Sequence, residues 1–200
     1  MNRSVISARG MPLRRNNIDT DQIIPARFCY RPERDGHGPS LFGDWRQDPG
    51  FVLNDARYRG ARILVAGREF ATGSSREYAV WAIKNFGFDV VIAPSFGDIF
   101  YKNAILNDLL PLKAGEDAIE WLWDSIEREP SATIEIDLTA DRIGIAGRAV
   151  AAEMAPHFKR QYVANLDHIA VTLERLGAIG RFEAGRAPGL ARTLPAGARR

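Results

Sequence analysis

The chain has 200 residues, of which 46% are hydrophobic and 26% charged. This composition is typical of one folded globular domain and excludes a disordered or collagen-like chain. A single cysteine, Cys29, excludes an intrachain disulfide framework and indicates a reducing compartment, so we expect a cytoplasmic protein. No apolar run approaches the roughly 20 residues of a membrane span, and we therefore expect no membrane association.

The first 60 residues are rich in turn-forming residues such as Asn16, Asn17 and Pro25. Residues 31–39 form a polar, glycine-rich loop. A loop of this length inside a compact domain is either functional or a surface excursion, and the residues leave both open.

The middle of the chain alternates between short apolar runs and amphipathic segments. The pattern predicts strands at 61–66, 89–93 and 109–112, and helices at 75–86, 97–107 and 115–128. Strand, helix and strand at this spacing form a βαβ unit with parallel strands. Residues 132–138 and 143–145 are expected to pair as an antiparallel hairpin, and 154–176 to form a last helix. The sequence thus predicts an α/β fold with a parallel core and an antiparallel flank.

The end of the chain differs in charge from the body. Residues 181–200 hold five arginines and one acid, whereas the whole chain carries a net charge of only +2. The first 180 residues are therefore mildly acidic, which argues against nucleic acid as the main partner. We expect one domain over 1–180 and a basic, disordered tail over 181–200. A solvated tail and an anion-binding arm both fit this composition.

The loop after the first apolar strand is the most informative segment. Ser74 can cap the following helix, with Glu77 as its capping-box partner. Gly73 allows a close approach to the backbone, and Arg76 adds a bidentate cation, so an anion should bind at this helix N-terminus. The spacing fits neither a phosphate-binding P-loop, nor a dinucleotide fingerprint, nor a nucleophile elbow, which favours a carboxylate ligand. A helix cap without a ligand is the alternative.

Several blocks of the sequence match one family. Gly73-Ser74-Ser75-Arg76-Glu77 resembles the signature of the swivelling domain of the aconitase superfamily. The run from Val91 to Tyr101 and the blocks at 19–25, 42–46, 51–54 and 107–111 resemble the bacterial long form of the 3-isopropylmalate dehydratase small subunits. The resemblance spans about residues 4–176 and implies a swivelling β/β/α three-layer domain.

The resemblance also implies a reaction and a partner. Members of this family belong to heteromeric hydro-lyases that interconvert 2-isopropylmalate and 3-isopropylmalate in leucine biosynthesis. A 4Fe–4S cluster on a separate large subunit is the Lewis acid, and one cysteine here cannot supply three thiolate ligands. We therefore expect no cofactor or metal bound by this chain, a cluster-bearing large subunit as its partner, and a small dicarboxylate substrate.

Seven residues of this sequence match functional positions of the family. Catalysis is assigned to Ser74, Arg76 and Asp21, with Ser74 taking a proton next to a carboxylate and Arg76 clamping that carboxylate. Substrate binding is assigned to Arg34, Ser75, Gly73 and Thr72. Arg34 could instead be a solvated loop charge, and Asp21 could belong to an Asx-turn.

Two other features stay open. Tyr78 stands where the family usually has histidine, and Asn165 is not followed by the usual glycine. Such departures suit a related subunit acting on citraconate and 2-methylmalate, homoaconitate or dimethylmalate, with specificity in the loop 28–40. A non-catalytic binding subunit that uses its basic tail is a further alternative. The three histidines show no metal-ligand spacing, and we expect ordinary surface or core residues.

Overall fold

The computed structural model describes residues 4–73, 76–166 and 168–186. Its strands are β1 (Val5–Leu13), β2 (Ile18–Asp19), β3 (Ile63–Ala66), β4 (Phe70–Thr72), β5 (Val90–Ala93), β6 (Leu110–Lys113), β7 (Thr133–Asp137), β8 (Arg142–Ile145) and β9 (Arg148–Ala151). Its α-helices are α1 (Thr20–Ile23), α2 (Glu77–Phe86), α3 (Asp98–Leu106), α4 (Glu116–Arg128), α5 (Pro156–Ala164), α6 (His168–Leu173) and α7 (Leu176–Ala184). Five short 3₁₀ helices, η1 (Ala26–Phe28), η2 (Gly38–Ser40), η3 (Trp45–Gln47), η4 (Val52–Asn54) and η5 (Ala56–Tyr58), lie between β2 and β3.

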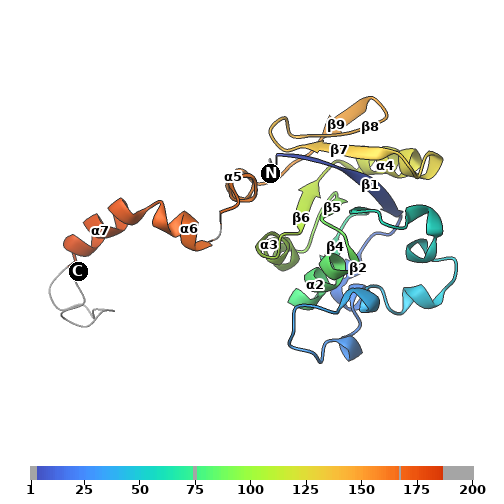
Figure 1. Ribbon diagram of the computed structural model, residues 1–200, viewed down its shortest axis with the longest axis horizontal. Coiled ribbons are helices and arrows are strands. Elements are labelled where there is room, and N and C mark those ends of the chain that lie inside the picture. Colours follow the sequence, from blue (N-terminus) through green and yellow to red (C-terminus); the bar gives the residue numbers. More distant parts are fainter. Residues whose placement is uncertain (1–3, 74–75, 167, 187–200) are drawn as a thin grey trace. The chain divides into compact units, whose positions relative to one another are not determined.

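Seven strands form one mixed sheet in the order β6-β5-β3-β1-β7-β8-β9. The strands β6, β5, β3 and β1 pair in parallel, whereas β1 with β7, β7 with β8 and β8 with β9 pair antiparallel. The predicted α/β class, with its parallel core and antiparallel flank, is confirmed. Figure 1 shows the two halves of the sheet meeting at β1.

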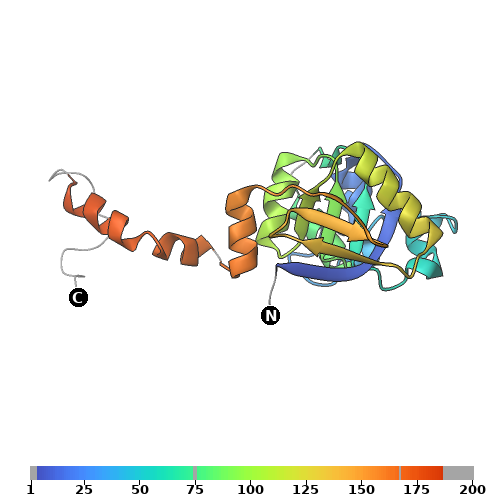
Figure 2. The same ribbon diagram turned by 90° about the horizontal axis from the view of Figure 1, so that it is seen from above.

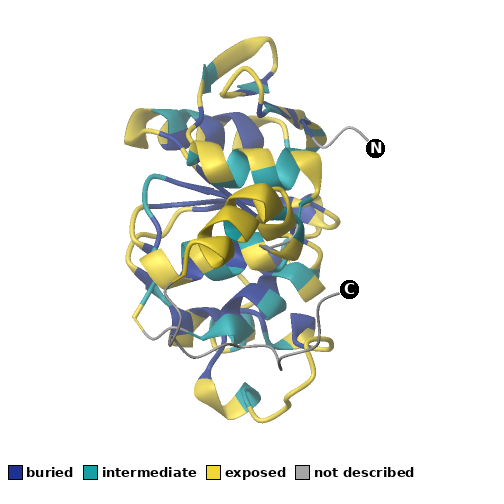
Figure 3. Ribbon diagram, turned by 90° about the vertical axis from the view of Figure 1, so that its left-hand side faces the viewer, coloured by how far each residue is buried: buried dark blue, intermediate teal, exposed yellow. Residues whose placement is uncertain are grey.

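Helices cover the sheet on two sides. Figure 1 and Figure 3 show α4 on one side of the sheet and α2 and α3 on the other, so that the fold has three layers. The side chain of Trp123 on α4 ties its helix to the sheet, because the indole Nε1 donates a hydrogen bond to the Val65 carbonyl oxygen at 2.8 Å. The view from above in Figure 2 shows α4 running alongside the strands.

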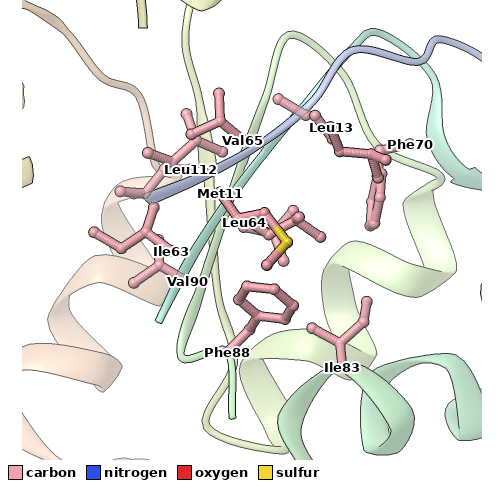
Figure 4. Close-up of a cluster of buried hydrophobic side chains, with 14 of the residues drawn as sticks. Met11, Leu13, Ile63, Leu64, Val65, Phe70, Ile83, Phe88, Val90 and Leu112 are labelled. Carbon is pink, nitrogen blue, oxygen red and sulfur yellow. The ribbon is translucent and has the colours of Figure 1, made fainter. Parts of the chain in front are cut away.

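The core lies between the parallel strands and α2. Figure 4 shows Met11 and Leu64 facing Phe88 and Ile83, and all four side chains are buried. The β3 and β5 strands are buried over their whole length, as expected for parallel strands covered on both faces. This packing fixes where each parallel strand ends, and therefore where the loops after the strands lie.

Three predictions about the elements need correction. Strand β1 was not predicted, because its apolar residues are interrupted by a serine, an arginine, a glycine and a proline in Val5–Leu13. It nevertheless occupies the centre of the sheet. The loop expected at 67–73 contains β4, and the hairpin continues into a third strand, β9.

The segment expected as one helix at 154–176 is divided into α5 and α6, and α7 begins at its last residue. The first helix, α5, ends at Ala164, and its C-cap residue Asn165 adopts the left-handed conformation with φ 54°. Asparagine tolerates that conformation better than most residues, so it can end a helix where the family has a following glycine. The chain divides by its contacts into residues 1–165 and 166–200. Most of the predicted tail lies outside the described residues, so the expected boundary at 180 and the disorder of 181–200 stay predictions.

Candidate functional site

Three loops meet where the parallel strands β1, β3 and β5 end. The Gly67 N–H donates to the Arg15 carbonyl oxygen at 3.0 Å, and the Asn17 N–H donates to the Arg68 carbonyl oxygen at 2.8 Å. The loop after β5 joins them, because the Phe70 N–H donates a hydrogen bond to the Ser95 carbonyl oxygen at 3.0 Å. In open parallel sheets, ligand sites lie at the carboxyl ends of the strands, as these loops do.

The short strands β2 and β4 bring two of these loops side by side. They form a parallel two-stranded sheet in which Asp19 pairs with Thr72. Figure 1 shows this pair next to α2. As a result, the segment from Asp19 to Asp21 lies directly beside Thr72 and Gly73, which the sequence places among the substrate-binding residues.

The carboxylate of Asp19 organises the first of these segments. It accepts a hydrogen bond from the Asp21 N–H at 2.6 Å, while the Gln22 side-chain oxygen accepts one from the Asp19 N–H at 2.8 Å. The Asp19 side chain also accepts from the backbone N–H of Gln22, which completes a capping box between Asp19 and Gln22 at the start of α1. Sequence reasoning missed Asp19, although Asp19-Thr20-Asp21-Gln22 has the residue types and the spacing of a capping box.

Gly73 sits against this cap. Its φ is +89°, in the region that favours glycine, and a side chain there would overlap the Asp19 carboxylate, with its Cβ 2.9 Å from Asp19 Cγ. The predicted close approach to the Gly73 backbone is therefore made by a carboxylate of the chain itself. Only glycine satisfies both the backbone conformation and the contact.

Asp21 and Arg76 form an ion pair across the site. The distance from Arg76 Nη1 to Asp21 Oδ1 is 2.6 Å, with side-chain exposures of 30% for Arg76 and 52% for Asp21. The cap of α1 is Asp19, so the Asx-turn considered for Asp21 belongs to its neighbour. The guanidinium carries five N–H donors in a planar fork, so it can bind an anion in addition to Asp21.

The start of α2 differs from the prediction. The helix begins at Glu77, two residues later than expected, and Arg76 occupies the cap position, where its side chain makes no capping hydrogen bond to the helix. The Glu77 carboxylate accepts a hydrogen bond from Asn107 Nδ2 at 2.9 Å, and the predicted capping box of Ser74 with Glu77 is wrong. Ser74 and Ser75 themselves lie outside the described residues, so their assigned roles stay predictions.

The loop that carries Arg34 is anchored to α2 at its far end. His37 is 2% exposed, and its Nε2 lies 2.8 Å from the Glu33 carbonyl oxygen. Its ring meets Tyr78 edge-on, with the ring centroids 5.2 Å apart. The Tyr78 ring, at the position where the family usually has histidine, therefore supports this loop. The expectation of an ordinary packed histidine is confirmed for His37.

Arg34 is exposed, and no residue within the described ranges pairs with its guanidinium. The structure thus brings Asp21, Thr72, Gly73 and Arg76 together, and it shows no contact that ties Arg34 to them. A binding role for Arg34 stays a prediction. Cys29 is half-buried and packs against the core, with its thiol donating weakly to the Pro25 carbonyl oxygen at 3.9 Å, as is typical of a small packed residue.

In the part of the chain that the structure describes, no three His, Cys, Asp or Glu side chains gather as a metal site requires. In the same residues, every helix is too short or too polar to cross a bilayer.

Comparison with known proteins identifies relatives over almost the whole chain. Residues 6–117 match the family model of the aconitase C-terminal domain. The 3-isopropylmalate dehydratase small subunit of Salinispora tropica is 47% identical over 185 residues, which cover 92% of this chain and 95% of the relative. The protein of the same name from Acidothermus cellulolyticus is 46% identical over 180 residues, covering 90% and 91%.

A solved structure agrees with these relatives. The crystal structure of 3-isopropylmalate dehydratase from Methanocaldococcus jannaschii matches with a TM-score of 0.64 at 28% identity, covering 89% of this chain and 99% of that one. The shared domain includes the strands β1, β3 and β5 and the loops after them. The chain belongs to the family of 3-isopropylmalate dehydratase small subunits, within the aconitase superfamily.

Proposed function

We propose that this chain is the small subunit of a heteromeric hydro-lyase that interconverts 2-isopropylmalate and 3-isopropylmalate in leucine biosynthesis. The observation that carries the proposal is the Arg76–Asp21 ion pair, placed at the start of α2 and next to Gly73. An arginine fork beside a helix N-terminus suits a substrate carboxylate. The relatives and the fold support the same reaction class.

In this proposal the chain supplies the binding and proton-transfer half of the site. Arg76 binds the substrate carboxylate, and Asp21 holds the guanidinium in place. Ser74 accepts the proton from the carbon next to that carboxylate, the freed electron pair forms the double bond, and the hydroxyl group leaves from the neighbouring carbon. The helix N-terminus and Arg76 would stabilise the serine alkoxide, because a serine hydroxyl alone is a weak base.

The remaining part of the site is proposed to come from a large subunit. A 4Fe–4S cluster on that partner supplies Lewis-acid assistance for the departing hydroxyl. The one cysteine of this chain cannot provide a cluster with its thiolates. Arg34, Ser75 and Thr72 are proposed to complete the binding of the dicarboxylate. A cytoplasmic location rests on the single cysteine and stays a prediction.

The test is reconstitution with a cluster-bearing large subunit. Formation of the unsaturated acid is followed by its absorbance, with isopropylmalate compared against 2-methylmalate, homoaconitate and dimethylmalate. We expect the highest kcat/KM with isopropylmalate. Another acid as the best substrate would correct the substrate, and no rate above that of the large subunit alone, with several large subunits tried, would refute the proposal.

Two variants test the residues within that assay. Arg76→Lys keeps the charge but loses the fork, and we expect kcat/KM to fall roughly 100-fold or more. Ser74→Ala should lower kcat by about three orders of magnitude or more. Arg57→Lys is the matched control. Arg57 also forms an ion pair, with 2.7 Å between its Nη2 and Asp55 Oδ2, but it is not among the site residues. Full activity of Ser74→Ala would instead favour a non-catalytic binding subunit, and deletion of 181–200 would test its tail.

A further inference from the structure

The loop after β5 forms hydrogen bonds to the segment 69–72, which leads into the site. The Ser95 hydroxyl accepts a hydrogen bond from the Glu69 N–H at 2.8 Å and donates one to the Glu69 carboxylate at 2.6 Å. The backbone repeats the contact on the next residue, because Phe70 donates to the Ser95 carbonyl oxygen at 3.0 Å and accepts from the Gly97 N–H at 2.9 Å. Four hydrogen bonds thus join two residues of one loop to two of the other.

Two residues of the segment 69–72 have backbone dihedral angles that their residue types disfavour. Glu69 and Ala71 have φ of 55° and 58°, in the left-handed region that non-glycine residues avoid. A non-glycine residue in this region is strained and persists only where its surroundings hold it. Gly97 packs tightly against this turn, because a Cβ on it would lie 3.2 Å from Thr72 Cα. The loop after β5 supplies the surroundings that hold it.

The conformation of this segment determines where the site residues lie. Thr72 follows Ala71 directly and pairs with Asp19, and Gly73 then packs on the Asp19 carboxylate. If Glu69 relaxed to a negative φ, the direction of the chain through Thr72 and Gly73 would change. Asp21 lies two residues after Asp19, and Arg76 lies three residues after Gly73. A shift of these two segments would therefore move the carboxylate and the guanidinium relative to each other.

We propose that Ser95 is a positioning residue for the site. Its hydroxyl holds Glu69 in the left-handed conformation and thereby sets the position of Thr72 and Gly73. Ser95 acts through Glu69 and is not assigned a contact with substrate. The proposal rests on the proposed function for its kinetic consequence, but its structural consequence can be measured on this chain alone.

The kinetic test is Ser95→Ala in the reconstituted enzyme. We expect kcat to fall roughly 100-fold, the size of effect that a misplacement of about 1 Å can cause, with a smaller change in KM. The control is Asn54→Ala, because the Asn54 amide also makes two hydrogen bonds, to the carbonyl oxygens of Arg46 at 2.9 Å and Asp48 at 2.8 Å. We expect the control to keep its rate within about twofold, although both variants lose hydrogen bonds.

A second variant separates positioning from general stability. Glycine adopts the left-handed conformation as readily as any other, so in a Glu69→Gly background the Ser95→Ala change should lower kcat by roughly tenfold or less. Equal losses of kcat in the two backgrounds would overturn the proposal. So would a Ser95→Ala enzyme that is as active as the Asn54→Ala control, and the proposed function would then still stand.

Hydrogen exchange tests the contact between Ser95 and Glu69 without a partner subunit. In Ser95→Ala the amides of residues 69–72 should exchange at least tenfold faster than in the unaltered chain, because the Glu69 N–H loses its acceptor. The amides of β3 should not change. Unchanged exchange at 69–72 would refute the positioning role. If the unaltered chain activates no large subunit, the proposed function fails and the exchange result still decides the role of Ser95.

Discussion

Replacing Gly73 by alanine tests the geometry of the site most directly. Two costs are expected. Alanine at a φ of +89° is strained by about 1–2 kcal/mol. Its Cβ would also displace the Asp19 carboxylate from the cap of α1, and the loss of an N-cap costs about 1 kcal/mol. We expect the free energy of unfolding to fall by roughly 2–3 kcal/mol in total.

Gly147 is the matched control for the first cost. It lies in the turn between β8 and β9 with φ +82°, and a Cβ there would meet nothing within 4 Å. Gly147→Ala therefore carries the strain without the displaced carboxylate. The difference between the two variants, about 1 kcal/mol in the free energy of unfolding, measures the contact with Asp19.

The assay is urea denaturation of both variants, followed by tryptophan fluorescence, together with the rate of the reconstituted enzyme. Because Asp21 follows the displaced cap and pairs with Arg76, we expect Gly73→Ala to lose most of its activity and Gly147→Ala to keep it. Equal unfolding free energies for the two variants, with activity retained in both, would show that the Asp19 carboxylate does not require glycine at 73.

Two further predictions concern the Arg34 loop and the hairpin. His37→Phe keeps an aromatic ring but removes the donor to the Glu33 carbonyl oxygen, so the free energy of unfolding should fall by about 1 kcal/mol. KM should rise because the loop that carries Arg34 loses its support, and an unchanged KM in the reconstituted assay would contradict this. The Thr139 hydroxyl and neighbouring backbone N–H groups hold the pKa of the Asp137 carboxyl below its ordinary value. The stability from Asp137 is therefore present above the ordinary pKa and is lost as pH falls through the lowered one. Thr139→Ala should raise the Asp137 pKa toward its ordinary value, which an NMR titration of the carboxylate measures. An unchanged Asp137 pKa would assign its lowering to the backbone donors.

Local patterns were sufficient for the middle of the chain. The strands β3, β5 and β6 and the helices α3 and α4 lie within one or two residues of their predicted positions, because a buried parallel strand and an amphipathic helix each leave a periodic signal. The residue types around Gly73 and Arg76 also led to an anion site at the start of α2, which stays a prediction. The family blocks were readable for the same reason, since they are contiguous in the sequence.

Other features required the tertiary structure. Strand β1 has no clean alternation in Val5–Leu13, and only pairing with β3 on one side and β7 on the other makes it a strand. Asp19 looks like an ordinary cap until the β2–β4 pairing places Gly73 against it. Ser95 has no local signal at all, because its partner Glu69 is 26 residues away.

The sequence by itself determined the alternation of strands and helices, the chemical types of the site residues and the family. Only the tertiary structure decided which carboxylate faces the arginine, which one packs on the glycine, and which hydroxyl holds the turn. The physical reason is that periodicity and residue type are properties of neighbouring positions. Contacts between loops depend instead on how parallel strands bring their distant carboxyl ends to one edge of the sheet.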